Sequence, residues 1–228
     1  MRIADIFFSI QGEGRLAGVP SIFVRLTGCN LRCAWCDTPY TSWEPEGEAV
    51  PQAEILKRIS SLPSRYVVVT GGEPLLSPEV VPLCAALRER DYHVTIETAA
   101  TVFRPVECDL ASLSPKLSNS TPRERGGGRY ATRHEQLRLR PGVIRAFMVR
   151  SDYQLKFVIE QAADLVEVET LLAELPGVDR DKVLLMPQGI TREELMERGP
   201  MVVEACKEHG FRYCPRLHVE LFGNRRAT

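Results

Sequence analysis

Three cysteines, Cys29, Cys33 and Cys36, lie close together in the stretch TGCNLRCAWCDT. Thiolates at this C-x3-C-x2-C spacing are typical ligands of a metal ion or an iron–sulfur cluster. A structural zinc ion normally has four protein ligands, so zinc would need Asp37 or a distant histidine as the fourth. A 4Fe-4S cluster held by three cysteines keeps one iron free to bind a small molecule. The spacing alone leaves both kinds of site open.

The composition excludes several classes of protein. The chain has 228 residues and no break in composition, which predicts a single domain over residues 1–228. Its 29 basic residues nearly balance its 30 acidic ones, so we expect no nucleic acid bound through bulk charge. The apolar N-terminal run contains Asp5 and no cleavage site follows it. We therefore expect no signal peptide, no membrane partner and a cytoplasmic location.

The cysteines outside this group have a simpler explanation. The total of seven is odd, which favours metal-binding or catalytic thiols over a set of disulfides. We expect the other four to be small buried side chains. They are Cys84, Cys108, Cys206 and Cys214.

Strand and helix patterns alternate along the chain. Apolar, β-branched runs, typical of strands buried on both faces, occur at 21–28, 65–72, 93–98, 108–114, 153–159 and 182–188. Helical patterns occupy 52–62, 77–91, 162–175 and 191–210. We expect Ser77 to cap the second of these helices, and Thr191 with Glu194 to form a capping box on the last. The alternation predicts an α/β fold with a mostly parallel sheet, either doubly wound or curled toward a barrel.

Three motifs follow predicted strands directly. They are the cysteine stretch after 21–28, TGGEP (70–74) after 65–72 and SPK (114–116) after 108–114. Taken alone, TGGEP is a tight strand-to-helix turn in which Gly71 and Gly72 permit positive φ. Because the carboxyl ends of parallel strands meet at one edge of a sheet, we expect the three motifs to form one site.

The motifs together carry a resemblance to a known family. The cysteine spacing, the aromatic Trp35 and the TGGEP turn resemble the radical S-adenosylmethionine (SAM) superfamily. QGEG (11–14), CDT (36–38), IET (96–98), SPK and RLHVELFGN (216–224) resemble its 7-carboxy-7-deazaguanine synthase family. The resemblance implies a single-domain partial (β/α) barrel and a homodimer. It also implies ring contraction of 6-carboxy-5,6,7,8-tetrahydropterin with loss of ammonia, in queuosine biosynthesis, by a radical formed from SAM at a 4Fe-4S cluster.

The resemblance also implies a role for each motif position. Cluster ligands are Cys29, Cys33 and Cys36, and Mg2+ is held by Thr38. Positions expected to contact SAM are Trp35, Cys36, Asp37, Gly72, Ser114, Pro115, Lys116, Met186, Pro187, Gln188 and Gly189. Positions expected to contact the pterin are Ile10, Gln11, Gly12, Glu13, Arg25, Thr70, Glu97 and His218. Relatives carry Gln-Pro where this chain has Met186-Pro187.

Several of these roles have a chemical basis and a competing structural explanation. The planar guanidinium of Arg25 suits a carboxylate, but it could also be a surface arginine of a strand. Mg2+ prefers oxygen ligands and retains waters, so one hydroxyl of Thr38 is enough, although Thr38 could simply cap the next turn. Glu97 could cap a helix, and His218 could be structural.

An arginine-rich segment, residues 118–152, interrupts the pattern. It holds eight arginines, no lysine and three acidic residues, and resembles an insertion between two strands. We expect a mobile surface loop followed by a helix from about Pro141, or else a docking surface for an acidic reductant such as flavodoxin. Two other functions stay open at this point: a glycyl-radical enzyme activase, and a non-catalytic zinc or iron–sulfur module that contacts RNA through these arginines.

Overall fold

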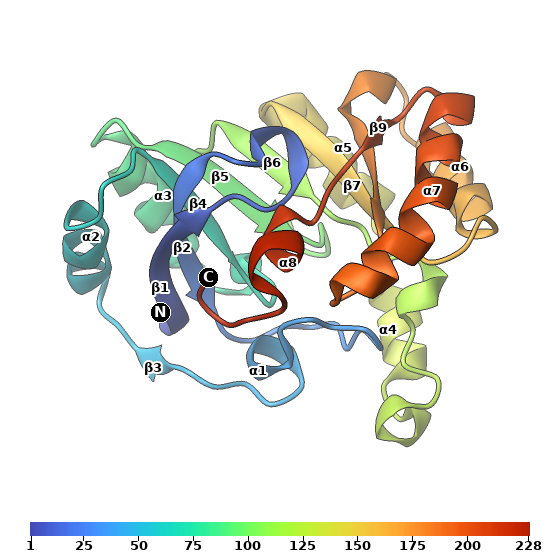
Figure 1. Cartoon of the computed structure of the whole chain (residues 1–228). Coiled ribbons are helices and arrows are strands. Elements are labelled where there is room, and N and C mark those ends of the chain that lie inside the picture. Colours follow the sequence, from blue (N-terminus) through green and yellow to red (C-terminus); the bar gives the residue numbers. More distant parts are fainter.

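A nine-stranded sheet forms the centre of the computed structural model, which describes all residues, 1–228 (Figure 1). The strand order is β3-β1-β2-β4-β5-β6-β7-β8-β9. The bounds are β1 Arg2–Ile10, β2 Pro20–Leu26, β3 Glu48–Ala49, β4 Tyr66–Gly71, β5 His93–Thr98, β6 Leu110–Leu113, β7 Tyr153–Ile159, β8 Val183–Pro187 and β9 Arg212–Tyr213. β1 pairs antiparallel with β2 and β3, and all the other pairs are parallel. The predicted α/β fold with a mostly parallel sheet is confirmed.

Helices connect the parallel strands, except that β5 leads to β6 without one. Their bounds are α1 Pro39–Ser42, α2 Gln52–Ser60, α3 Val80–Arg88, α4 Ala131–Arg138, α5 Pro141–Arg150, α6 Asp164–Ala173, α7 Arg192–His209 and α8 Leu217–Phe222. Short 3-10 turns are η1 Gly14–Leu16, η2 Pro74–Leu76, η3 Ser118–Ser120, η4 Arg125–Gly128 and η5 Arg180–Lys182. α2, α3, α5, α6 and α7 bury apolar side chains in one cluster with the strands. None of the helices has the length and apolar character needed to span a membrane.

The two faces of the strands differ in chemistry. In β2, Ile22, Val24 and Leu26 belong to the core shared with the helices, whereas Phe23 and Arg25 line a cavity on the opposite face. This period of two is the ordinary alternation of a strand. It places one polar row across neighbouring strands, made by Arg25, Thr70, Glu97, Ser112 and Lys156. The prediction of strands buried on both faces is confirmed for β6, β7 and β8, although the cavity face carries polar side chains.

Most predicted elements are present within two residues of their expected ends. The six predicted strands and four predicted helices are confirmed, as is the capping box of Thr191 and Glu194. The sequence patterns missed β1, β3 and β9. The prediction for Ser77 was wrong, because α3 begins at Val80 and Ser77 ends the 3-10 turn before it.

The arginine-rich segment is more regular than expected. The predicted helix from Pro141 is α5, but the residues before it form η3, η4 and α4 rather than a loop. Figure 1 shows α4 extending at the lower right, and α8 in front of the strands.

Candidate active site

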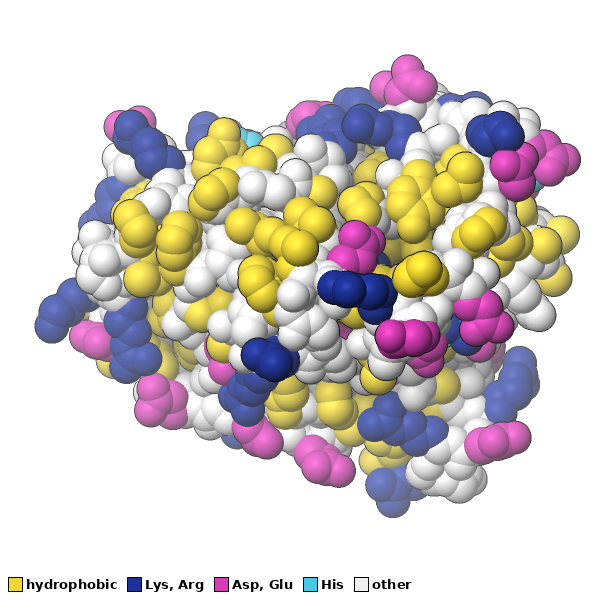
Figure 2. Space-filling view, in the orientation of Figure 1, with side chains coloured by type: hydrophobic (Ala, Val, Ile, Leu, Met, Phe, Trp, Pro, Cys, Tyr) yellow, Lys and Arg dark blue, Asp and Glu magenta, His cyan; other side chains and the backbone are white.

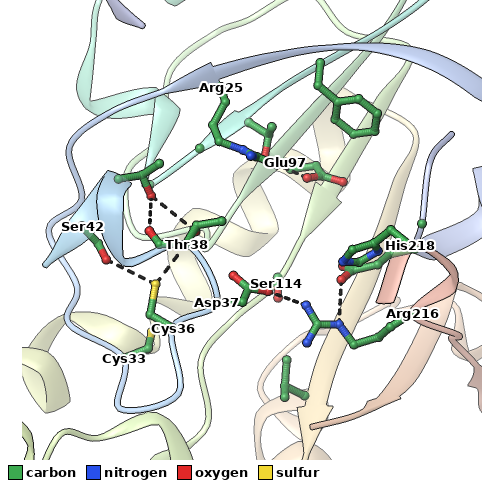
Figure 3. Close-up of a pocket in the computed structure, with 18 of the residues that line it drawn as sticks. Arg25, Cys33, Cys36, Asp37, Thr38, Ser42, Glu97, Ser114, Arg216 and His218 are labelled. Atoms are coloured by element: carbon green, nitrogen blue, oxygen red, sulfur yellow. Dashed lines mark hydrogen bonds and ion pairs between the residues drawn. The ribbon is translucent and has the colours of Figure 1, made fainter. Parts of the chain in front are cut away.

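One cavity brings together the cysteine stretch, the polar row of the sheet and the C-terminal residues (Figure 3). Its lining includes every position predicted to bind a ligand, with the exception of Pro115, Pro187 and Gly189. These positions come from six strand ends or the loops after them, from the loop before α1 and from α8. The motifs therefore meet at the carboxyl edge of the sheet, as the sequence predicts.

The three cysteines line the cavity on the side of α1. All three are free thiols, and they contact one small apolar group that includes Leu31 and Ala99. Burial raises the pKa of Cys29 to about 11 and that of Cys33 further still, so a bound cation is needed to hold them as thiolates. The irons of a 4Fe-4S cluster would supply this positive charge, and the three thiolates would hold the cluster.

A single zinc ion fits this arrangement less well. No three cysteine, histidine, aspartate or glutamate side chains converge closely enough to hold one ion. Asp37, the fourth ligand that the zinc hypothesis needs, is instead paired with the guanidinium of Arg216. His134 does not offer a fourth zinc ligand either, because both of its ring nitrogens hydrogen-bond to protein atoms.

The TGGEP turn packs directly on the cysteine stretch. The backbone N–H of Gly72 donates to Leu26 O (3.2 Å) and that of Glu73 donates to Gly28 O (2.9 Å). A Cβ at Gly72 would lie 2.3 Å from Gly28 O, and one at Gly71 would lie 2.0 Å from Leu26 O. Gly71 also has a φ of 130°. Both glycines are therefore required by close backbone contact, and positive φ applies only to Gly71.

Glu73 of this turn orders the next strand end rather than facing a ligand. It is buried, and its carboxylate accepts bonds from the Thr98 hydroxyl (2.7 Å), the Ala99 N–H (3.0 Å) and the Thr101 hydroxyl (3.3 Å). Burial raises the pKa of Glu73, although these bonds oppose the shift. The carboxylate thus joins the turn after β4 to the loop after β5.

The arginine-rich segment covers the other side of the cysteine stretch. Ala34 N–H donates to Ser120 O (2.8 Å), and Trp35 Nε1 donates to Asn119 O (3.0 Å). The N–H of Arg32 donates to Nδ1 of His134 (3.2 Å). Burial lowers the pKa of His134 to about 4, so the ring is neutral and can accept this bond. The segment is therefore part of the site's framework.

Several of the positions that the sequence predicts to contact the pterin are connected by hydrogen bonds. Glu97 accepts bonds from Gln11 Nε2 (3.0 Å) and from the Thr70 hydroxyl (2.8 Å). His218 packs on Gly12, where a Cβ would lie 2.0 Å from its Nδ1. Burial lowers the pKa of His218, which favours a neutral imidazole facing the cavity. Glu97 therefore contacts other site residues rather than capping a helix.

Arg25 lies in the cavity and already has protein partners. Its Nη1 donates to the Tyr40 hydroxyl and to Asp5 (3.4 Å), and its guanidinium stacks on Phe7, 5.0 Å from the ring centre. Both hydrogen bonds use Nη1, so Nε and Nη2 of the guanidinium take part in neither of them. Arg25 is only 16% exposed, which excludes the alternative of a solvent-exposed strand arginine.

Thr38 and Ser42 lie beside the last cysteine. Thr38 occupies the N-cap position of α1, but its side chain makes no capping bond. Its hydroxyl accepts a bond from Thr41 (3.4 Å) and lines the cavity. The Ser42 hydroxyl is buried and lies 3.2 Å from Sγ of Cys36.

Two charged residues that the sequence analysis did not select lie at the centre of the site. Lys156 and Arg216 bind opposite oxygens of Glu13, and Arg216 also binds Asp37. Burial alone would raise the pKa values of both carboxylates. The neighbouring cations instead hold the pKa of Glu13 far below its usual range and lower that of Asp37. The sequence carries a signal for each cation: Lys156 interrupts an apolar strand, and Arg216 precedes His218 by two positions.

The C-terminal residues close one side of the cavity. Asn224, Arg225, Arg226 and Thr228 contribute to its lining. Arg226 pairs with Asp5 (2.9 Å) and Glu46 (2.7 Å) and stacks over Tyr40, which fixes the tail to β1 and to the loop before β3.

Comparisons with known proteins agree with this geometry. Residues 23–115 match the radical SAM superfamily. A 7-carboxy-7-deazaguanine synthase of Halobacterium salinarum is 43% identical over 99% of this chain and 92% of its own length. One from Rhodopirellula baltica is 42% identical, with coverages of 99% and 88%. The crystal structure of QueE from Escherichia coli superposes with a TM-score of 0.70 at 26% identity, over 93% of this chain and 92% of that one.

Proposed function

Because the chain belongs to the 7-carboxy-7-deazaguanine synthase family of the radical SAM superfamily, we propose that it contracts the ring of 6-carboxy-5,6,7,8-tetrahydropterin to 7-carboxy-7-deazaguanine. Ammonia is lost in this step, which belongs to queuosine biosynthesis. The observation that carries the proposal is the single cavity in which three free cysteines face the polar row of the sheet.

The cofactor end of the cavity is the side of α1. Cys29, Cys33 and Cys36 would hold a 4Fe-4S cluster, as their buried thiols fit the donor set of such a cluster. When bound and reduced, such a cluster would supply the electron that splits SAM into methionine and a 5′-deoxyadenosyl radical. Protein groups around it bind SAM and exclude water. The proposed SAM contacts are the segments 35–37, 114–116 and 186–189, with Gly72.

The substrate end is the side of β1, β2 and α8. Arg25 would bind the pterin carboxylate through the part of its fork that Tyr40 and Asp5 do not use. Gln11 and Glu97 carry both donors and acceptors, which suits the edge of a pterin ring. The ion pair of Glu13 with Lys156 lies behind this edge and fixes the segment that presents Gln11.

A magnesium ion at Thr38 is part of the proposal. The hydroxyl of Thr38 is not used as a helix cap and lines the cavity beside Cys36. One hydroxyl, the substrate's own oxygens and waters suffice for an octahedral Mg2+ shell. Such an ion would offset the charge of the substrate carboxylate and fix the ring's orientation.

The geometry favours this function over the glycyl-radical activase. An activase must admit a segment of a partner protein, whereas the tail from Asn224 to Thr228 narrows this cavity. Arg25 and the polar row suit a small carboxylated molecule instead. A homodimer and a cytoplasmic location stay predictions.

We propose that an acidic one-electron carrier such as flavodoxin docks on the arginine-rich segment. This segment contacts the cysteine stretch directly, and Arg123, Arg129 and Arg133 are exposed on it. Figure 2 shows basic side chains at the lower right, where Figure 1 places α4. We expect Arg129→Glu with Arg133→Glu to slow cluster reduction by flavodoxin but not by dithionite. Lys57→Glu on distant α2 is the control, and equal rates in both variants would refute this docking site.

Anaerobic turnover tests the function itself. Cluster-loaded protein is given SAM, Mg2+, reductant and 6-carboxytetrahydropterin, and the products are followed by mass spectrometry. We expect 7-carboxy-7-deazaguanine together with ammonia. Cleavage of SAM without any change in the pterin would contradict the proposed substrate.

A further inference from the structure

One guanidinium group joins three segments that the proposed function assigns to two different ligands. Nε of Arg216 donates to Oε1 of Glu13 (3.1 Å), and Nη2 donates to Asp37. Nη1 donates to the carbonyl oxygen of Gly189. Glu13 lies in the pterin-binding segment, Asp37 follows the last cluster cysteine, and Gly189 lies in the turn assigned to SAM. Figure 3 shows Arg216 reaching Asp37 across the cavity.

Arg216 is buried where it makes these contacts. It is 6% exposed, so water does not supply substitute partners. Glu13 and Asp37 both pair with Arg216, so one guanidinium is the cation that the two carboxylates share. The arrangement stabilises two like charges in one small volume only while all three groups keep their positions.

The backbone around Arg216 is fixed to the pterin side as well. The N–H of Leu217 donates to Gly12 O (2.9 Å), and the ring of His218 packs on Gly12. A shift of the segment Gln11–Glu13 therefore moves Arg216. Because the guanidinium is planar and rigid, such a shift also changes its bonds to Asp37 and Gly189.

We propose that Arg216 is a positioning residue that couples the two binding sites. SAM bound against the cysteine stretch and the Gly189 turn would restrain two of the three acceptors of Arg216. Glu13 is then held in place before the pterin arrives, so each ligand binds more tightly when the other is present. The inference rests on the proposed function only for the identity of the two ligands.

Binding measurements on the cluster-loaded, oxidised protein test this coupling, since SAM is not cleaved without reduction. The Kd of 6-carboxytetrahydropterin is measured by anaerobic calorimetry with and without SAM. We expect SAM to lower this Kd by about 5- to 150-fold in the unmodified protein and by less than about twofold in Arg216→Gln. Arg192→Gln is the control, since exposed Arg192 bonds only to the backbone of α8. The proposal would be overturned if SAM did not change the Kd of the pterin in the unmodified protein. It would also be overturned if SAM lowered this Kd as much in Arg216→Gln as in the unmodified protein.

Arg216→Lys serves if the glutamine variant does not fold. Its ammonium keeps the charge but cannot reach three acceptors in one plane, so we expect a coupling at least about threefold weaker than in the unmodified protein. Unchanged coupling in the lysine variant would refute the role of Arg216 equally.

A second measurement needs no pterin and so separates this inference from the proposed substrate. The Kd of SAM is measured for Glu13→Gln, Arg216→Gln and the double variant. If Glu13 acts on SAM through Arg216, Glu13→Gln weakens SAM binding on its own and has no further effect in Arg216→Gln. Equal effects of Glu13→Gln in both backgrounds would contradict the coupling even if the pterin proves to be the wrong substrate.

Discussion

The ammonium group of Lys156 in β7 donates a hydrogen bond to the carboxylate of Glu13, which lies 143 residues earlier in the chain. Lys156 is 6% and Glu13 15% exposed in this ion pair, so neither charge is well hydrated. The pair fixes the segment after β1 to the centre of the sheet. Its stability depends on pH in a direction that follows from the shifted pKa values.

Glu13→Gln should remove one source of acid sensitivity. The folded pKa of Glu13 lies below its unfolded value of 4.5, so its stabilising contribution is present above that pH and is lost as the pH falls below it. We expect Glu13→Gln to lower the free energy of unfolding at pH 7 by about 3 to 5 kcal/mol. The difference from the unmodified protein should shrink toward about pH 2. Urea unfolding followed by circular dichroism measures this. Exposed Glu44→Gln is the control, and a difference independent of pH would contradict the pKa shift.

Cys33→Ala should abolish cluster binding, because two thiolates cannot hold three irons. We expect no iron–sulfur absorption after anaerobic reconstitution and no 5′-deoxyadenosine from SAM. Cys84→Ala is the matched control, since Cys84 lies in the core between the sheet and the helices. This substitution should lower the free energy of unfolding by about 1 kcal/mol, through lost packing alone. A Cys33→Ala variant that still cleaves SAM at the original rate would exclude the cluster site.

Arg25→Lys should weaken pterin binding while SAM cleavage without substrate stays measurable. The lysine keeps the charge but loses the fork, at a cost of about 1.5 to 3 kcal/mol in apparent affinity. Tyr40→Phe controls for the loss of Arg25's protein partner. If Tyr40→Phe raises KM as much as Arg25→Lys does, anchoring within the protein explains the effect and the carboxylate contact is wrong.

Thr38→Val should lose the response to magnesium, whereas Thr38→Ser should retain it. Valine keeps the shape without the oxygen, and serine keeps the oxygen. Turnover is measured in metal-depleted buffer with Mg2+ added back. An unmodified protein that works equally well without magnesium would refute the metal role of Thr38.

Ser42→Ala should lower the reduction potential of the cluster. The Ser42 hydroxyl lies 3.2 Å from Sγ of Cys36, and hydrogen bonds to cluster sulfurs tune the potential of iron–sulfur centres. A redox titration followed by electron paramagnetic resonance measures the shift, with Ser60→Ala on the exposed face of α2 as the control. An unchanged potential would show that this hydroxyl does not act on the cluster.

The sequence predicted the parts of the fold that local patterns encode. The six predicted strands are apolar runs, most of which contain β-branched residues, and the capping box of Thr191 is a short-range signal. β1 was missed because Arg2 and Asp5 interrupt its apolar pattern, and β3 and β9 have only two residues each. Short strands of this kind exist because neighbouring strands supply their hydrogen bonds.

The site was predictable where a motif is contiguous and not where partners meet across the fold. The cysteines, QGEG and TGGEP lie in single stretches and were all placed at the cavity. Arg216 and Asp37 are 179 residues apart, and no local pattern connects them. Lys156 stands out in the sequence as a charged residue in an apolar strand. Its pairing with Glu13 could not be predicted, because it depends on how β7 packs against the loop after β1.

The hydrogen bonds between the arginine-rich segment and the cysteine stretch affect how the protein acquires its cluster. Zinc fingers are unfolded until the metal arrives, and their metal affinity is also their folding energy. Here Ser120, Asn119 and His134 accept hydrogen bonds from backbone or indole N–H groups of the stretch, so protein contacts also hold the backbone that carries the cysteines. Cluster binding to such a stretch therefore loses less ordering entropy than metal binding to a zinc finger does. A substitution in the arginine-rich segment that breaks these hydrogen bonds would thus weaken cluster assembly without touching a cysteine.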